Sequence, residues 1–205
     1  MHPWRERLNR WFTPIATRSP LSPNAITILA LLINVAAAIL LALGARWPPN
    51  FLIAVACITV AGFADALDGI VARLQHKETR FGDFLDHVCD RISDTLLAAC
   101  WMIGNRVREV MVVAVVIVVM LNGYIGTQIE ASFRERNYEA LGRGEFVLTL
   151  VVFPILSFIL FVNGWAALVL GGATIAEWLS ILLLAFALLG ILQRIALARR
   201  MDRSS

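Results

Sequence analysis

Residues 65–90 read DALDGIVARLQHKETRFGDFLDHVCD and hold most of the aspartates of an otherwise apolar chain. Asp65 and Asp68 are three residues apart, and Asp86 and Asp90 are four residues apart. On a helix, either spacing places both side chains of a pair on one face. Because the loop between the pairs is short, we expect two antiparallel neighbouring helices whose carboxylate faces oppose each other.

The rest of the chain is strongly hydrophobic. Of its 205 residues, 59% are hydrophobic and 16% are charged, and the mean hydropathy is +0.75. A typical soluble domain is about 45–50% apolar, and a soluble core of this size could not bury the excess. The composition therefore predicts an integral membrane protein with a single domain.

Apolar runs of about 20 residues are long enough to cross a membrane as helices. Turn signals separate them at Pro48-Pro49, Gly104-Asn105 and Gly171-Gly172. The expected helices cover residues 24–44, 50–74, 82–104, 108–132, 145–163 and 174–199. We therefore predict an all-α fold in which a membrane domain, residues 24–200, contains six transmembrane helices.

Residues 1–23 differ from these runs. Trp4, Leu8 and Trp11 recur at helical spacing, with Arg5 and Arg7 on the other side. This pattern predicts an amphipathic helix that lies in the membrane interface. Residues 201–205 are expected to form a short cytoplasmic tail.

Basic residues are concentrated in the terminal segments and in alternate loops. The opposite loops contain only Arg46, Arg106 and Arg108, so the positive-inside rule places both termini in the cytoplasm. We expect a multi-pass protein of the plasma membrane with a cytoplasmic active site, in contact with membrane lipids and with no nucleic-acid partner. Tryptophans near the expected membrane edges are interpreted as interfacial anchors: Trp47, Trp101, Trp165 and Trp178.

The four aspartates need compensation at a membrane, where each charge costs roughly 2.5–3.5 kcal/mol on insertion scales. Mg²⁺ or Mn²⁺ suits carboxylate ligands combined with substrate phosphates. Two such ions roughly 3.5–4 Å apart can clamp the attacking and leaving oxygens of a phosphoryl transfer. The alternatives are buried ion pairs with Arg73 and Arg91, and a divalent-cation transporter, although the repeated halves typical of transporters are not evident.

The pattern Asp65-x2-Asp68-Gly69-x2-Ala72-Arg73-x8-Gly82-x3-Asp86-x3-Asp90 resembles the signature of the CDP-alcohol phosphatidyltransferases at every fixed position. The resemblance implies an enzyme of phospholipid biosynthesis. Such an enzyme transfers a phosphatidyl-type group from a CDP-diacylglycerol-like lipid to the hydroxyl of a polar acceptor alcohol, and CMP is released. It also implies a homodimer.

The resemblance further implies roles for individual residues. Asp65, Asp68 and Asp86 would bind one metal ion, and Asp90, with Asp65 or Asp86, would bind a second. Asp90 would also act as the general base on the acceptor hydroxyl. The residues that match CDP-lipid-binding positions are Asn24, Thr27, Gly69, Arg73, Thr79 and Gly82.

The acceptor site is matched less completely. Residues 123–130 resemble the branch that contains phosphatidylinositol-phosphate synthases, but Gly126 and Gln128 stand where that branch has Lys and Arg. Arg143 and Arg194 match other basic residues of the branch, and Arg134 or Arg136 could substitute for the missing cations. The expected acceptor residues are therefore Arg134, Arg143 and Arg194, and the acceptor is inositol phosphate, glycerol phosphate or another polar alcohol.

Overall fold

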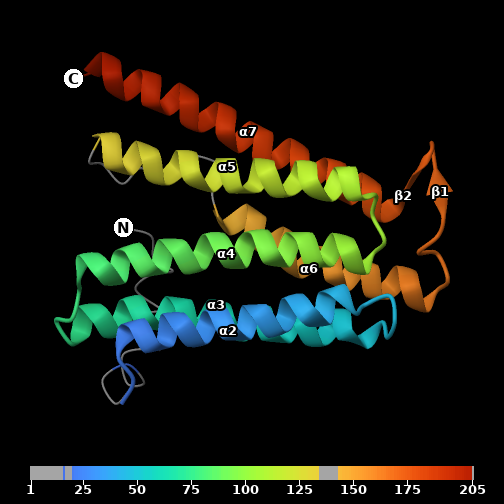
Figure 1. The fold of residues 1–205 in the computed structure, drawn as a ribbon, viewed down its shortest axis with the longest axis horizontal. Helices are drawn as coiled ribbons and strands as arrows, with labels where there is room; N and C mark the ends of the chain where they lie inside the picture. The colour runs from blue at the N-terminus through green and yellow to red at the C-terminus, as the bar shows by residue number, and fades with distance from the viewer. Residues whose placement is uncertain (1–15, 17–19, 134–142, 205) are drawn as a thin grey trace.

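The computed structural model describes residues 16, 20–133 and 143–204, with the side chains of 143–148 and 203–204 outside the description. The interfacial helix expected in residues 1–23 therefore lies almost wholly outside the described residues. Six long helices follow within the described part: α2 Pro23–Ala42, α3 Pro49–Leu74, α4 Arg80–Gly104, α5 Glu109–Phe133, α6 Arg143–Val162 and α7 Ile175–Ser204. Their ends lie within two residues of the expected ones, except that α7 continues to Ser204 (Figure 1).

Two of the helices begin with side-chain caps. Ser22 precedes α2, and its hydroxyl oxygen accepts the N–H of Ala25 at 3.3 Å. Thr79 precedes α4, and its hydroxyl oxygen accepts the N–H of Gly82 at 3.0 Å. Such caps satisfy N–H groups that have no partner within the helix. Both helix starts lie at the end of the molecule where α3 ends (Figure 1).

The packing of α2, α3 and α4 differs from the expected one. We expected α3 and α4 to be direct neighbours, but α2 packs along both, whereas α3 and α4 have few direct contacts with each other. Small buried residues of α2, Ala30, Ala37 and Ala38, allow this close approach. The two aspartate-bearing helices are therefore antiparallel, and α2 packs against both of them.

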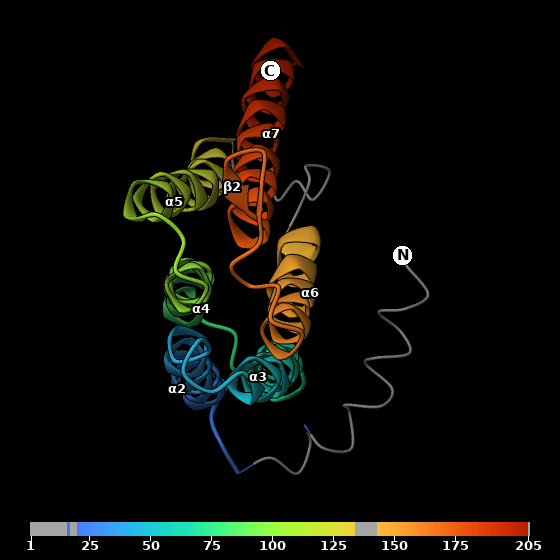
Figure 2. The same ribbon diagram turned by 90° about the vertical axis from the view of Figure 1, so that its right-hand side faces the viewer.

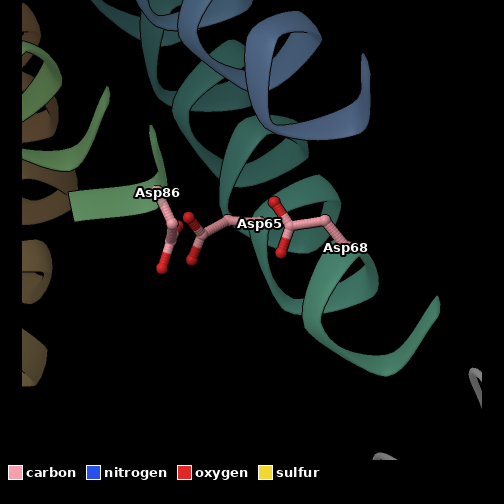
Figure 3. Close-up of side chains that lie close together, drawn as sticks. All are labelled: Asp65, Asp68 and Asp86. Carbon is pink, nitrogen blue, oxygen red and sulfur yellow. The ribbon is translucent and has the colours of Figure 1, made fainter. Parts of the chain in front are cut away.

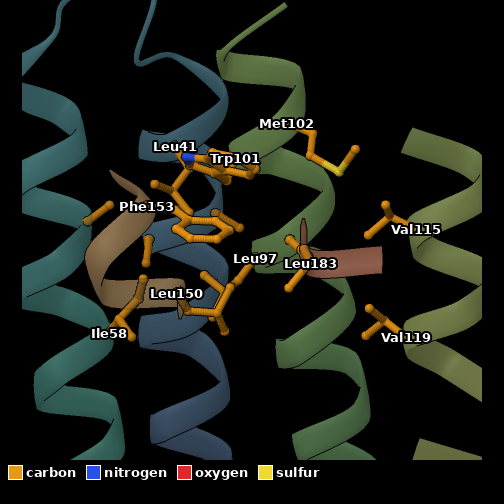
Figure 4. Packing of buried hydrophobic residues seen from close by; sticks show 14 of the residues in the cluster. Leu41, Ile58, Leu97, Trp101, Met102, Val115, Val119, Leu150, Phe153 and Leu183 are labelled. Carbon is orange, nitrogen blue, oxygen red and sulfur yellow. The ribbon is translucent and has the colours of Figure 1, made fainter. Parts of the chain in front are cut away.

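The remaining helices complete the bundle. In Figure 2, α2, α3, α4 and α6 form one group, with α5 and α7 beside it. The helix α6 packs on α3, and α5 packs on both α4 and α7. The hydrophobic core lies where these groups meet and includes Leu41, Trp101, Val115 and Leu183 (Figure 4).

Trp101 corrects one expectation. Its side chain is 2% exposed, and its indole N–H donates to the hydroxyl oxygen of Ser157 in α6 at 2.9 Å. It is a core residue that connects α4 to α6, and the prediction of an interfacial anchor was wrong. Trp47, Trp165 and Trp178 are exposed, as anchors would be.

Four helices are long and apolar enough to cross a membrane: α2, α3, α5 and residues Ile175–Asp202 of α7. They identify the chain as an integral membrane protein. The helix α4 is less apolar because its first half carries the charged residues of the site. The apolar part described for α6, Thr149–Val162, is shorter than these four helices.

A small hairpin interrupts the helical fold at the end opposite the aspartates (Figure 1). Its strands, β1 Val169–Leu170 and β2 Ala173–Thr174, are antiparallel. Gly171 and Gly172 have φ values of +59° and +86°, as a two-residue turn with two left-handed positions requires. The expected turn at these glycines is confirmed.

The same end is fastened by Glu177. Its carboxylate accepts the N–H of Thr174 at 2.8 Å, and the Thr174 hydroxyl oxygen accepts the N–H of Glu177 at 3.2 Å, which is a capping box. The guanidinium of Arg108 also donates to Glu177 at 2.6 Å. This network holds the first turn of α7 against the start of α5.

Candidate active site

Three of the four signature aspartates lie together. Asp65 and Asp68 project from α3 and Asp86 from α4, and one carboxylate oxygen of each lies within 4.8 Å of the others (Figure 3). Asp68 is buried, and the other two are half-buried. Three carboxylates this close repel one another unless a cation lies among them, and their hard oxygen donors suit a divalent ion such as Mg²⁺ or Mn²⁺.

The helix α2 contributes a hydroxyl to this group. Thr27 Oγ1 lies 2.6 Å from Asp68 Oδ2 and 3.1 Å from the carbonyl oxygen of Pro23. A hydroxyl has one proton, and the shorter distance assigns it to the carboxylate. Thr27 therefore orients Asp68 from the neighbouring helix.

Asp90 lies apart from this group. It is one turn beyond Asp86 on α4 and is 5% exposed. The cluster of carboxylates found among the described residues contains Asp65, Asp68 and Asp86 but not Asp90. The structure thus unites three of the predicted metal ligands and places the fourth further along α4, inside the bundle.

A cavity of about 490 Å³ opens beside the carboxylates. Its walls come from the start of α2, the end of α3, the connecting loop and the start of α4. The residues predicted to bind the CDP-lipid all line it: Asn24, Thr27, Gly69, Arg73, Thr79 and Gly82. Asp68 and Asp86 line it as well, so the metal cluster and the predicted lipid-binding residues share one cavity.

The cavity also contains residues that the sequence did not point to. Lys77, Arg80 and Asp83 are part of its wall. Lys77 and Arg80 lie in the eight-residue spacer of the signature, and Asp83 lies in the three-residue spacer that follows Gly82, where the pattern specifies no residue type. Their cavity position follows from the tight turn that joins α3 to α4.

Gly82 lies where α4 approaches α2. A Cβ atom on Gly82 would lie 3.1 Å from both Asn24 Oδ1 and Thr79 Oγ1, closer than such contacts normally are. Gly69 is less confined, because a Cβ there would lie 3.5 Å from Nη1 of Arg73. The missing side chain of Gly82 therefore allows the first turns of α2 and α4 to meet at the cavity.

Only one of the three predicted acceptor residues can be placed with its side chain. Arg194 of α7 donates from Nη1 to the carbonyl oxygen of Asn122, and its guanidinium lies against Gly126 of α5. Arg143 begins α6, but its side chain, like the whole of Arg134, lies outside the described residues.

The chain belongs to the CDP-alcohol phosphatidyltransferase family. The sequence model of that family matches residues 20–189, which include the four aspartates and every part of the cavity wall. The family predicted from the signature is thereby confirmed.

Two curated relatives illustrate the similarity. An archaetidylinositol phosphate synthase of Methanothermobacter thermautotrophicus is 35% identical over 97 residues, which cover 47% of this chain and 47% of the relative. A phosphatidylinositol phosphate synthase of Mycobacterium tuberculosis is 34% identical over 133 residues, which cover 62% and 59%. The matched part thus spans about half the length of these relatives.

Solved structures match over more of the chain. The crystal structure of the M. tuberculosis phosphatidylinositol phosphate synthase with manganese and citrate has a TM-score of 0.67 and 26% identity, and covers 91% of this chain and 88% of that chain. The structure of the same enzyme with CDP-DAG bound has a TM-score of 0.66 and 27% identity, with coverages of 92% and 94%.

Proposed function

We propose that this protein is a metal-dependent CDP-alcohol phosphatidyltransferase. It transfers a phosphatidyl-type group from a CDP-diacylglycerol-like lipid to an acceptor hydroxyl and releases CMP. The observation that carries the proposal is that Asp68 and Asp86 of the carboxylate cluster line the same cavity as the predicted lipid-binding residues. The manganese and the CDP-DAG bound to the mycobacterial enzyme in its crystal structures support it.

The carboxylates would hold the metal. Asp65, Asp68 and Asp86 would ligate one Mg²⁺ or Mn²⁺ ion, and Asp90, with Asp65 or Asp86, would ligate a second. Divalent ions at this position would neutralise the negative charge that develops on the diphosphate during transfer. Thr27 keeps the Asp68 carboxylate in its ligating orientation through the 2.6 Å hydrogen bond.

The cavity wall would bind the cytidine diphosphate portion of the donor lipid. Arg73 can donate two parallel hydrogen bonds to a phosphate. Asn24 and Thr79 offer polar side chains at the adjoining helix starts, and Gly69 and Gly82 leave space for the donor. These residues would orient the donor phosphorus toward the carboxylate cluster.

Asp90 would take the proton from the acceptor hydroxyl as its oxygen attacks the donor phosphorus, and CMP would leave. A carboxylate can perform this step when a neighbouring cation keeps it ionised. The buried position of Asp90 on α4, one turn beyond Asp86, suits a base that acts from the interior side of the cavity.

We propose inositol phosphate as the acceptor, because the curated relatives named above are synthases of inositol phosphate lipids. Glycerol phosphate or another polar alcohol is the alternative, because Gly126 and Gln128 replace basic residues of that branch. Arg194, with Arg134 or Arg143, would bind the polar part of the acceptor.

We further propose six membrane-spanning helices, a plasma-membrane location with both termini in the cytoplasm, and a homodimer. The basic residues near the ends of α3 and α7 support this orientation. The cavity would then open toward the cytoplasm, where nucleotide-activated lipids and polar acceptors meet.

The test is CMP release by the purified full-length protein in lipid nanodiscs that contain CDP-diacylglycerol. We expect release that requires Mg²⁺ or Mn²⁺, stops with a chelator, and depends on the acceptor in a panel of inositol phosphate, glycerol phosphate, inositol, glycerol and serine. Failure of every acceptor to release CMP, with metal and donor present, would overturn the proposal.

A further inference from the structure

The last part of α7 carries a groove on its outer face. The groove has a volume of about 590 Å³ and is lined by Leu192, Ile195, Ala196, Arg199 and Arg200. These residues follow one another at spacings of three and four along the helix, so they share one face. All of them are exposed. We call this surface the α7 groove. It is separate from the cavity beside the carboxylates, which α7 does not line.

The α7 groove faces away from the neighbouring helices. Within the described part of the chain, α7 packs mainly on α5 and only slightly on α6, at the edge of the bundle (Figure 2). Arg194, which donates to the Asn122 carbonyl oxygen of α5, precedes Arg199 by five residues, and five residues turn a helix by about 140°. Leu192 is 64% exposed, so the apolar part of the groove is open to the membrane.

The groove changes from apolar to basic along the helix axis, and this change falls at the level of a membrane surface. Trp178, near the start of α7, is exposed, as an interfacial tryptophan would be. Arg199 follows it by 21 residues, which correspond to about 32 Å of helix. The hydrocarbon core of a bilayer is about 30 Å thick. The arginines of the groove therefore lie at headgroup level, and Leu192 and Ile195 lie beside the acyl chains.

The arginines of the groove are not neutralised by the described part of the chain. No carboxylate there forms an ion pair with Arg199 or Arg200. Residues 194–203 contain four arginines and one acidic residue, Asp202, so this end of the helix is strongly positive. Guanidinium groups match phosphate oxygens, and basic residues beside a membrane attract anionic lipids. The groove thus offers a phosphate site directly above a surface for an acyl chain.

We infer that the α7 groove binds one anionic phospholipid of the surrounding membrane. Its phosphate lies against Arg199 and Arg200, and one of its acyl chains follows the apolar part of the groove. A zwitterionic lipid fits less well, because its amine repels the two guanidinium groups. The inference does not rest on the proposed reaction, and it assigns these two arginines a role outside the active site.

Charge also favours a lipid over a second copy of this chain as the occupant. A twofold interface brings the same surface of both copies together. With the twofold axis along the membrane normal, Arg199 and Arg200 of the two copies would approach one another and repel. A lipid phosphate instead neutralises them.

The test counts the lipids bound to the purified full-length protein in detergent by native mass spectrometry. The probes are phosphatidylglycerol and phosphatidylcholine with the same oleoyl chains. We expect the wild type to bind one phosphatidylglycerol more tightly than phosphatidylcholine. Arg199→Gln/Arg200→Gln should weaken this binding about 30-fold, because each basic residue near an anionic headgroup contributes about fivefold. Phosphatidylcholine binding should change little.

Arg46→Gln/Arg106→Gln is the matched control. It also removes two charges from exposed arginines, but these arginines line neither the groove nor the cavity. Ala196→Trp tests the apolar part, because the indole would fill the groove without changing its charge, and it should also weaken phosphatidylglycerol binding. Glycerol phosphate has the phosphate but no acyl chain, and it should not displace the lipid from the wild type.

Three results would contradict the inference: equal affinities of the wild type for the two lipids, equal losses of phosphatidylglycerol binding in the two double variants, or displacement of the lipid by glycerol phosphate. The same spectra report the oligomeric state. A change of oligomeric state in Arg199→Gln/Arg200→Gln, with lipid binding unchanged, would also contradict it and assign the groove to a contact between two copies.

Discussion

The hydrogen bond from Thr27 to Asp68 is the contact through which α2 reaches the carboxylate cluster. Partners that orient a metal ligand typically contribute 10–100-fold to metal affinity. We predict that Thr27→Val lowers Mn²⁺ affinity by about this factor, measured by titration calorimetry on the purified protein.

Two further variants should have a smaller and a larger effect on Mn²⁺ affinity than Thr27→Val. Thr27→Ser keeps the hydroxyl and should bind Mn²⁺ nearly as the wild type does, whereas Asp68→Ala removes a ligand and should abolish the binding. Unchanged affinity in Asp68→Ala would exclude Asp68 from the ligand set.

Asp90 is buried one turn beyond Asp86 and lies outside the cluster of three carboxylates, and we propose that it is the general base. We predict that Asp90→Asn lowers kcat by at least about a hundredfold, because the amide cannot accept the proton. Donor binding should persist, as judged by calorimetry with CDP-diacylglycerol. Asp202→Asn, at the exposed end of α7, is the control and should retain full turnover. Substantial turnover in Asp90→Asn would mean that another group is the base.

The start of α4 depends on its close approach to α2. A Cβ on Gly82 would press on Asn24 and Thr79, which both line the cavity. We predict that Gly82→Ala raises KM for the CDP-lipid several-fold. Gly62→Ala is a matched control, because alanine favours a helix over glycine by about 1 kcal/mol at either position and a Cβ on Gly62 meets no atom within 4 Å. Equal KM values in the two variants would show that the approach at Gly82 is not functional.

The position of α2 also explains why α3 and α4 can form a site. The helix α2 contacts both helices, and its first turns form part of the cavity wall beside Asp68 and Asp86. Thr27 of α2 also donates a hydrogen bond to Asp68. The site is therefore built by three helices, although the clustered aspartates come from two of them.

The cohesion of the whole bundle depends in part on a buried polar contact between α4 and α6. Trp101 donates to Ser157, which is fully buried. We predict that Ser157→Ala lowers the free energy of unfolding by about 1–3 kcal/mol, because the indole N–H is left without a partner. Thermal unfolding in detergent micelles measures the change.

Thr59→Ala is the control for this measurement. The Thr59 hydroxyl is exposed and donates within its own helix to the Val55 carbonyl oxygen at 2.8 Å. Its loss should change stability by less than Ser157→Ala does. An equal effect of the two variants would contradict a cross-helix role for Trp101.

The sequence by itself determined the helices, the family and three aspartates that form the carboxylate cluster. Apolar run length and turn residues predicted the six helices because both signals are local. The spacing of the aspartates predicted paired carboxylate faces for the same reason. The signature also identified residues that the fold brings into one cavity.

Only the tertiary structure decided how these parts meet. It packed α2 against both α3 and α4, buried Trp101 in the core, left Asp90 outside the carboxylate cluster, and brought Arg91 and Arg194 against Gly123 and Gly126. Each of these features depends on contacts between residues far apart in the chain. Helical periodicity defines which face a side chain occupies, but the neighbour of that face is chosen by the packing of the whole bundle.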